Sequence, residues 1–207
     1  EGDPLMYAVL YGVDTRAEKE IRELNEELGD EKILQNCGNA LTSQSVGPKI
    51  LWLKKNCPEI YKKAYKILSS TSYLVQKLTG ESVIDHYTAA NFTPLYDIKN
   101  LKWTDALTKN IIEIERLPKL KWTTEIAGCV SKAASNETGL ATGTPVTVGT
   151  IDAAAEAISV GVCSAGDMMM MYGSTIFIIQ VTNEKIIDGR LWYAPWLFKD
   201  LHGSMAG

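Results

Sequence analysis

The sequence is poor in the residues that build disulfide frameworks and metal sites. It has four cysteines and two histidines among 207 residues, and no two cysteines form a C-x-x-C pair. This pattern disfavours a zinc site, and disulfide scaffolds are typical of much smaller secreted chains. We therefore expect reduced thiols in a cytoplasmic protein, and we assign no residue as a metal ligand.

A strong charge of one sign and a long apolar run are also missing. The chain has 21 Lys and Arg against 25 Asp and Glu, a formal net charge of −4, whereas binding to a phosphate backbone needs excess positive charge. The longest apolar run is residues 5–11, and a helix needs about 20 residues to cross a bilayer. We therefore expect no nucleic-acid partner and no membrane partner.

The residues that are present divide the chain into two parts. Residues 1–140 contain 18 basic and 19 acidic residues, and residues 141–207 contain 3 and 6. The second part is rich in Gly, Ala, Val, Ile and Met, which is typical of strands buried on both faces. With 45% hydrophobic residues the chain can bury a sizeable core. We expect an α/β fold with a change of layer near residues 141–165.

The first part predicts helices after one short strand. The apolar run at residues 5–11 is typical of a buried strand, and Asp14 stands where the N-cap of the following helix belongs. Residues 71–78 predict a helix with Gly80 as its stop, and residues 103–105 predict the start of another.

The second part predicts alternating strands and helices. The expected order is strand, helix, strand, helix and then a hairpin, at residues 128–130, 133–140, 145–148, 152–160 and 168–181.

Asp152 is the first candidate for chemistry. It follows the strand-ending pair Gly149-Thr150 and opens an Ala-rich helix. Ligands of open α/β sheets bind beyond the carboxyl ends of strands, and a carboxylate there can accept a proton from a substrate hydroxyl. The alternative is that Asp152 only caps its helix, because aspartate is a common N-cap residue.

Two weaker candidates flank Asp152 in the sequence. The turn formed by Gly173, Ser174 and Thr175 exposes backbone N–H groups that can hold a phosphate, although a plain tight turn is the more common explanation of such a segment. Asp14, at a strand-to-helix turn, can bond a polyol hydroxyl, although capping is again the ordinary role.

In their order along the chain these segments resemble the FGGY family of carbohydrate kinases, most nearly its xylulokinase and gluconate-kinase-like branch. The resemblance covers nearly the whole chain. Its segments are YGVDTRA at 11–17, PKILWL at 48–53, PE at 58–59, YLVQKLTGE at 73–81, Asp85 with TAA at 88–90, TGL at 138–140, GTPV at 143–146, GTID at 149–152 and YGST at 172–175.

This resemblance implies an actin-like (ribonuclease H-like) ATPase fold whose cofactors are ATP and Mg²⁺ and whose substrate is a small sugar or sugar acid, xylulose or gluconate before others. Asp152 would be the catalytic base. Asp152, Asp14 and Gln44 would all contact the sugar. Gly173, Ser174 and Thr175 would face the nucleotide phosphates.

The resemblance also implies how the domains divide. Residues 1–165 would be the later part of the sugar-binding domain, and residues 166–207 the beginning of the nucleotide-binding domain. A homodimer is possible. The family's phosphate-binding hairpin and adenine site are not among these segments, so we expect an internal fragment that has no kinase activity alone.

Four departures from the family pattern bear on the substrate or on whether the protein is catalytic. Tyr11 replaces a tryptophan, Ser72 an aspartate and Thr150 a glycine, and Ala153 stands where many members have Asn or Gln. Arg16 is expected to pair with a nearby carboxylate. Two alternatives stay open: a non-catalytic sugar-binding or regulatory relative, and a structural module in which every motif is a cap or a turn.

Overall fold

The structure, a computed structural model, describes residues 2–173 and 175–207 and combines helices with four small sheets. Its first half is mainly helical, as the sequence predicts. The helices of this half are α1 (Glu18–Leu28), α2 (Asp30–Cys37), α3 (Val46–Asn56), α4 (Pro58–Lys63) and α5 (Ser70–Thr79). The expected stop of α5 is confirmed, because Gly80 has the left-handed conformation and its N–H bonds the Gln76 carbonyl.

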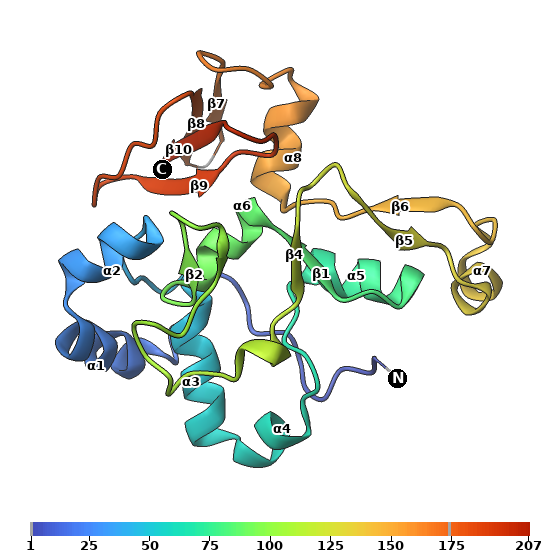
Figure 1. The fold of residues 1–207 in the computed structure, drawn as a ribbon, viewed down its shortest axis with the longest axis horizontal. Coiled ribbons are helices and arrows are strands. Elements are labelled where there is room, and N and C mark those ends of the chain that lie inside the picture. Colours follow the sequence, from blue (N-terminus) through green and yellow to red (C-terminus); the bar gives the residue numbers. More distant parts are fainter. Residues whose placement is uncertain (1, 174) are drawn as a thin grey trace.

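Short strands form the middle of the fold. Strands β1 (Val83–Asp85) and β4 (Lys119–Lys121) pair in parallel, and β5 (Ile126–Cys129) and β6 (Pro145–Thr147) pair antiparallel on either side of α7 (Lys132–Thr138). Figure 1 shows β1 and β4 near the centre, with α1–α3 on the left, α4 at the bottom, and β5, β6 and α7 on the right. The small elements between β1 and β4 are α6 (His86–Ala89), η1 (Ala90–Phe92), β2 (Tyr96–Asp97), β3 (Lys102–Trp103) and η2 (Ile114–Arg116).

The last part of the chain is one helix followed by an antiparallel sheet. Helix α8 (Asp152–Ser159) precedes β7 (Met168–Tyr172), β8 (Ile176–Thr182), β9 (Trp192–Pro195) and β10 (His202–Ala206). These strands are ordered β7-β8-β10-β9, and Met169 pairs with Ile179 in the register of the first two. The expected hairpin at residues 168–181 is therefore confirmed, and Figure 1 shows the sheet beside α8.

One hydrophobic core joins this sheet to the earlier elements. Trp196 is fully buried and packs edge-on against Tyr87 of α6, with ring centroids 5.6 Å apart. Gly203 of β10 allows this packing, because a Cβ there would lie 3.1 Å from the Trp196 ring. The side-chain amide of Asn39 adds a polar link, since it accepts from the Tyr193 N–H and donates to the Tyr193 carbonyl, both at 2.8 Å.

Two expected elements are wrong. Residues 5–11 form no strand in the described chain, because no neighbouring segment pairs with them, and Tyr7 is 95% exposed. Residues 103–105 do not open a helix. Trp103 instead pairs with Tyr96 across β2 and β3, and its indole N–H donates to the Pro118 carbonyl at 2.7 Å, which fixes the chain in an extended form. In both cases tertiary partners, or their lack, decide the structure.

Within residues 2–173 and 175–207, no helix combines the length and the apolar character that crossing a membrane requires.

His86 is buried in the centre of the fold and interacts with two aromatic residues. Its Nδ1 lies 2.8 Å from the Tyr96 hydroxyl, and its ring centroid lies 4.6 Å from that of Trp122. Burial lowers the pKa of His86 and the positive charge of Lys199 lowers it further, while Glu125 acts in the opposite direction. The imidazole is therefore held neutral in the folded state.

This burial predicts a loss of stability on mild acidification. The unfolded state takes up a proton on His86 below about pH 6.5, and the folded state does so only at lower pH, so His86 costs stability as pH falls between the two values. We expect the free energy of unfolding to drop by up to about 1.4 kcal/mol per pH unit in this window. Urea unfolding at several pH values measures it. His86→Gln should give a shallower pH dependence, and an unchanged dependence would contradict the assignment.

Candidate functional site

Asp152 lies at the start of α8 with its side chain exposed. The N-cap residue is Ile151, so Asp152 occupies the first helical position and does not cap the helix from outside. Its Oδ1 accepts from the Ala153 N–H at 2.8 Å. Ala154 and Ala157 are fully buried and fix the helix against the core. The carboxylate therefore stands on an anchored helix and is open to a ligand.

Tyr11 bonds to Gln44 and lies within the electrostatic influence of Asp152. Its hydroxyl donates to Gln44 Oε1 at 2.8 Å. Although two thirds of Tyr11 is exposed, partial burial and then the negative charge of Asp152 raise the pKa of its hydroxyl. Gln44 lies 33 positions after Tyr11 in the sequence, and Asp152 lies 108 positions after Gln44. The fold thus brings residues that are distant in sequence into the surroundings of Tyr11. With Oε1 of Gln44 engaged by Tyr11, its amide NH₂ group is the part suited to donate to a ligand oxygen.

Asp14 is held by Arg16. The carboxylate accepts from Arg16 Nη2 at 2.6 Å and from Nε at 2.9 Å, and the guanidinium lies over the Trp52 ring, 4.5 Å from its centroid. This side-chain bond to Arg16 holds the pKa of Asp14 below its ordinary value. The expected pairing of Arg16 is confirmed, and the expected N-cap role of Asp14 is wrong, because α1 begins at Glu18. The fork-shaped pair leaves fewer free acceptor sites on Asp14 for a sugar.

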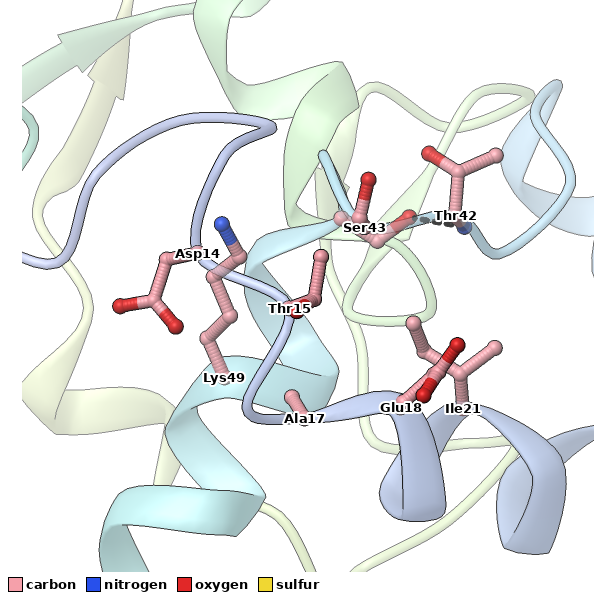
Figure 2. Close-up of a pocket in the computed structure, with 9 residues that line it drawn as sticks. Asp14, Thr15, Ala17, Glu18, Ile21, Thr42, Ser43 and Lys49 are labelled. Carbon is pink, nitrogen blue, oxygen red and sulfur yellow. Dashed lines mark hydrogen bonds between the residues drawn. The ribbon is translucent and has the colours of Figure 1, made fainter.

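Asp14 also borders a cavity of about 310 Å³ between α1 and the start of α3. Figure 2 shows Lys49 and the hydroxyl residues Thr42 and Ser43 around it, with Glu18 and Ile21 of α1 opposite. The full lining is Asp14, Thr15, Ala17, Glu18, Ile21, Thr42, Ser43, Ser45 and Lys49. Tyr11, Gln44 and Asp152 do not line this cavity, so Asp14 lies at a hollow that these three residues do not border.

Lys49 is the cation at this cavity. Its Nζ donates to the Leu10 carbonyl at 2.8 Å, which ties the segment before Asp14 to α3. Burial lowers the pKa of Lys49, and Arg16 acts in the same direction, while Asp14 acts against both. The sequence motif around Lys49 indicated a helix but gave no signal for this contact, because the partner is a backbone carbonyl.

Gly173 and Thr175 lie between β7 and β8. Gly173 and Thr175 are exposed, and the Gly173 N–H donates to the Thr175 carbonyl at 2.9 Å. That amide is therefore engaged within the turn. Ser174, the third residue that the sequence suggested for phosphate binding, lies outside the described residues.

The described residues contain no group of three or more His, Cys, Asp or Glu side chains that could hold a metal ion by themselves. A Mg²⁺ that accompanies a nucleotide usually has only one or two protein carboxylates and is completed by phosphates and water. An exposed carboxylate such as Asp152 fits that kind of site.

Comparison with solved structures identifies the fold. The xylulose kinase of Rhodospirillum rubrum superposes with a TM-score of 0.88 at 28% identity, over 94% of this chain and 40% of that one. The expected α/β, actin-like fold is therefore confirmed, and the chain has the architecture of a sugar kinase.

Comparison of sequences identifies the family. The family model described as "FGGY family of carbohydrate kinases, N-terminal domain" matches residues 1–159. The autoinducer-2 kinase of Klebsiella pneumoniae is 32% identical over 83% of this chain, and the xylulose kinase of Staphylococcus xylosus is 26% identical over 93% of it. The chain belongs to the FGGY family of carbohydrate kinases.

The chain spans only part of these relatives. It covers 32% of the length of the autoinducer-2 kinase and 40% of the length of the xylulose kinase of S. xylosus. Membership of the family therefore does not by itself establish the activity of a whole protein that contains this chain.

Proposed function

We propose that the protein containing this chain transfers a phosphoryl group from ATP to a hydroxyl of a small sugar or sugar acid. The observation that carries the proposal is the exposed Asp152 carboxylate at the start of an anchored helix, in a chain that belongs to a sugar-kinase family. A carboxylate in that position is suited to accept the proton of an attacking hydroxyl.

Asp152, Gln44 and Asp14 have different roles in the proposed reaction. Asp152 orients the attacking sugar hydroxyl toward the terminal phosphate and takes the proton from that hydroxyl. Gln44, whose side-chain oxygen is bonded by Tyr11, donates its amide N–H to another sugar hydroxyl. Phosphoryl transfer depends mainly on positioning and charge stabilisation, so this fixed arrangement supplies much of what the protein must provide. Asp14 acts at the cavity edge, where its pairing with Arg16 limits it to a secondary contact.

ATP and Mg²⁺ are the proposed cofactors. Gly173, Ser174 and Thr175 would lie against the nucleotide phosphates, and the bound metal would neutralise phosphate charge. In this arrangement residues 1–165 form the later part of the sugar-binding domain, and residues 166–207 begin the nucleotide-binding domain. The match of the family's N-terminal-domain model to residues 1–159 supports that division.

The substrate class follows from the relatives, and the particular substrate does not. Xylulose and gluconate are the first candidates, because solved structures with this architecture include a xylulose kinase and a gluconate kinase. Autoinducer-2 is a third, since autoinducer-2 kinases are 32% identical to this chain. Tyr11 and Ala153 change side chains next to Asp152, and differences of a few hydroxyl contacts decide such specificity.

An assay of sugar-dependent ADP release tests the proposal on the intact protein. We expect one of xylulose, gluconate and autoinducer-2 to raise ADP release at least about tenfold above the sugar-free rate, since domain closure over the correct sugar excludes water from the phosphate. The 207-residue chain alone is expected to show no turnover. The same sugar should raise the melting temperature, because a ligand that binds the native state stabilises it.

Other outcomes identify the alternatives. A sugar that raises the melting temperature without ADP release would indicate a non-catalytic sugar-binding relative. No effect of any of these sugars on either measurement would indicate a structural module and would refute the proposal.

A further inference from the structure

A buried carboxylate lies directly behind the loop that carries Asp152. Asp85 ends β1 and is 2% exposed. Its Oδ2 accepts three hydrogen bonds, from the Thr88 N–H at 3.3 Å, the Thr123 hydroxyl at 3.3 Å and the Thr150 hydroxyl at 2.9 Å. These donors belong to three different segments: α6, the chain after β4, and the loop before α8. One carboxylate oxygen thus joins parts of the chain that are distant in sequence.

Thr150 is the shortest of these contacts, and its backbone is held as well. The Thr150 carbonyl accepts from the Thr71 hydroxyl at 3.1 Å. The residue before it, Gly149, donates its N–H to the Thr123 carbonyl at 3.3 Å and has a φ of +72°, which a side chain would strain. A Cβ on Gly149 would also lie 3.1 Å from Thr71. The loop is therefore fixed on both sides, two residues before the start of α8.

The burial of Asp85 makes these bonds consequential. Burying a carboxylate costs free energy unless the carboxylate is hydrogen-bonded. Each donor to Asp85 Oδ2 therefore offsets part of the cost of burying this side chain. Burial raises the pKa of Asp85, while the bonds from Thr88 and Thr150 act to lower it. The 2.9 Å bond from the Thr150 hydroxyl is the shortest of the three bonds to Asp85 Oδ2, and it attaches the loop to this buried side chain.

We propose that Asp85 is a positioning residue, which fixes the backbone of residues 149–151 through the Thr150 hydroxyl and thereby sets the position of Asp152. The inference rests on the proposed function, since it gives Asp152 the role of base. Asp85 is buried and therefore acts through the loop, most directly through the Thr150 hydroxyl, and not by touching the substrate. Valine or glycine at position 150 has no hydroxyl for this contact.

The kinetic consequence is specific. A base displaced by about 1 Å from its productive position can cost up to about 100-fold in rate, whereas sugar contacts made by other residues survive. We expect Thr150→Val, which keeps the side-chain shape, to lower kcat of the intact protein about tenfold and to leave KM for the sugar within about twofold. Thr150→Ser restores the hydroxyl and should recover most of the rate.

A control variant separates this effect from general loss of a threonine hydroxyl. The Thr138 hydroxyl donates to the Ala134 carbonyl at 2.7 Å within α7, away from Asp152. Thr138→Val makes the same substitution at a hydroxyl that bonds only locally within α7, and it should leave kcat unchanged. Hydrogen–deuterium exchange of the peptide covering residues 149–153 gives a second measurement, in which Thr150→Val should raise exchange and Thr138→Val should not.

The outcomes keep the two proposals apart. Faster exchange at residues 149–153 together with a fall in kcat at constant KM supports the positioning role. If the wild-type protein has no sugar-dependent turnover, the proposed function fails, and exchange alone then decides whether Asp85 fixes the loop. Unchanged exchange in Thr150→Val, or a kcat within about twofold of wild type in an active protein, would overturn the inference.

Discussion

Replacing Asp152 by Asn in the intact protein is expected to lower kcat by about 10²- to 10⁴-fold, because a general base contributes that much to a proton-transfer step. Asparagine keeps a side-chain oxygen that can accept from the Ala153 N–H, now 2.8 Å from Asp152 Oδ1, so the start of α8 should be preserved. Sugar binding should therefore remain within a few-fold. Sugar-dependent ADP release and the sugar-dependent rise in melting temperature measure the two effects separately.

Glu156 provides the matched control. It lies one turn further along α8 and is exposed like Asp152, so Glu156→Gln removes the same charge from the same helix. This variant should keep wild-type turnover. An Asp152→Asn protein that retained activity within a few-fold of wild type would exclude Asp152 as the base, whatever the effect on binding.

Replacing Trp196 by Ala is expected to lower the free energy of unfolding by about 3–5 kcal/mol, the usual cost of deleting a buried Trp or Phe. Trp196 is fully buried, meets Tyr87 edge-on and fills the space left open by Gly203. The cavity cannot close easily, because Gly203 belongs to a paired strand of the sheet. Chemical unfolding followed by far-UV circular dichroism measures the loss without relying on the fluorescence of the deleted residue.

Two further variants complete this test. Trp196→Phe keeps most of the apolar volume and should lose much less stability, since no described residue accepts a hydrogen bond from the Trp196 indole N–H. Tyr65 is 84% exposed, and Tyr65→Ala should change stability by at most about 0.5 kcal/mol. If Trp196→Ala and Tyr65→Ala were equally mild, the packing of β9 and β10 onto α6 would not contribute to the stability of the fold.

The sequence predicted those elements that local chemistry determines. Gly80 ends α5 as expected, and the small residues around Asp152 correctly indicated a strand, a turn and a helix. The strand expected at residues 5–11 was wrong, because an apolar composition indicates a tendency to burial but does not specify which segment would pack against it. Trp103 misled because the contact that fixes it, its bond to the Pro118 carbonyl, involves a residue 15 positions away.

The sequence could propose residues for the candidate site, and it could not predict how they are arranged. Asp152 stands where strand-to-helix spacing placed it, and Arg16 pairs with a carboxylate as expected. The bond between Tyr11 and Gln44 joins residues 33 positions apart, and the bonds from Thr123 and Thr150 to Asp85 join residues 38 and 65 positions apart. No local pattern encodes contacts over such distances. These contacts depend on how whole elements pack, which propensity and periodicity do not specify.

The side-chain amide of Asn39 limits which edge of the last sheet can accept a further strand. Tyr193 lies in β9, the outer strand of the order β7-β8-β10-β9, and the backbone groups that Asn39 engages are those that point away from β10. Unpaired edge strands are templates for aggregation, and a side chain that imitates a neighbouring strand blocks that pairing. Among the described strands of this sheet, β7 is therefore the edge at which another polypeptide can add by backbone pairing, and β9 is protected at its centre.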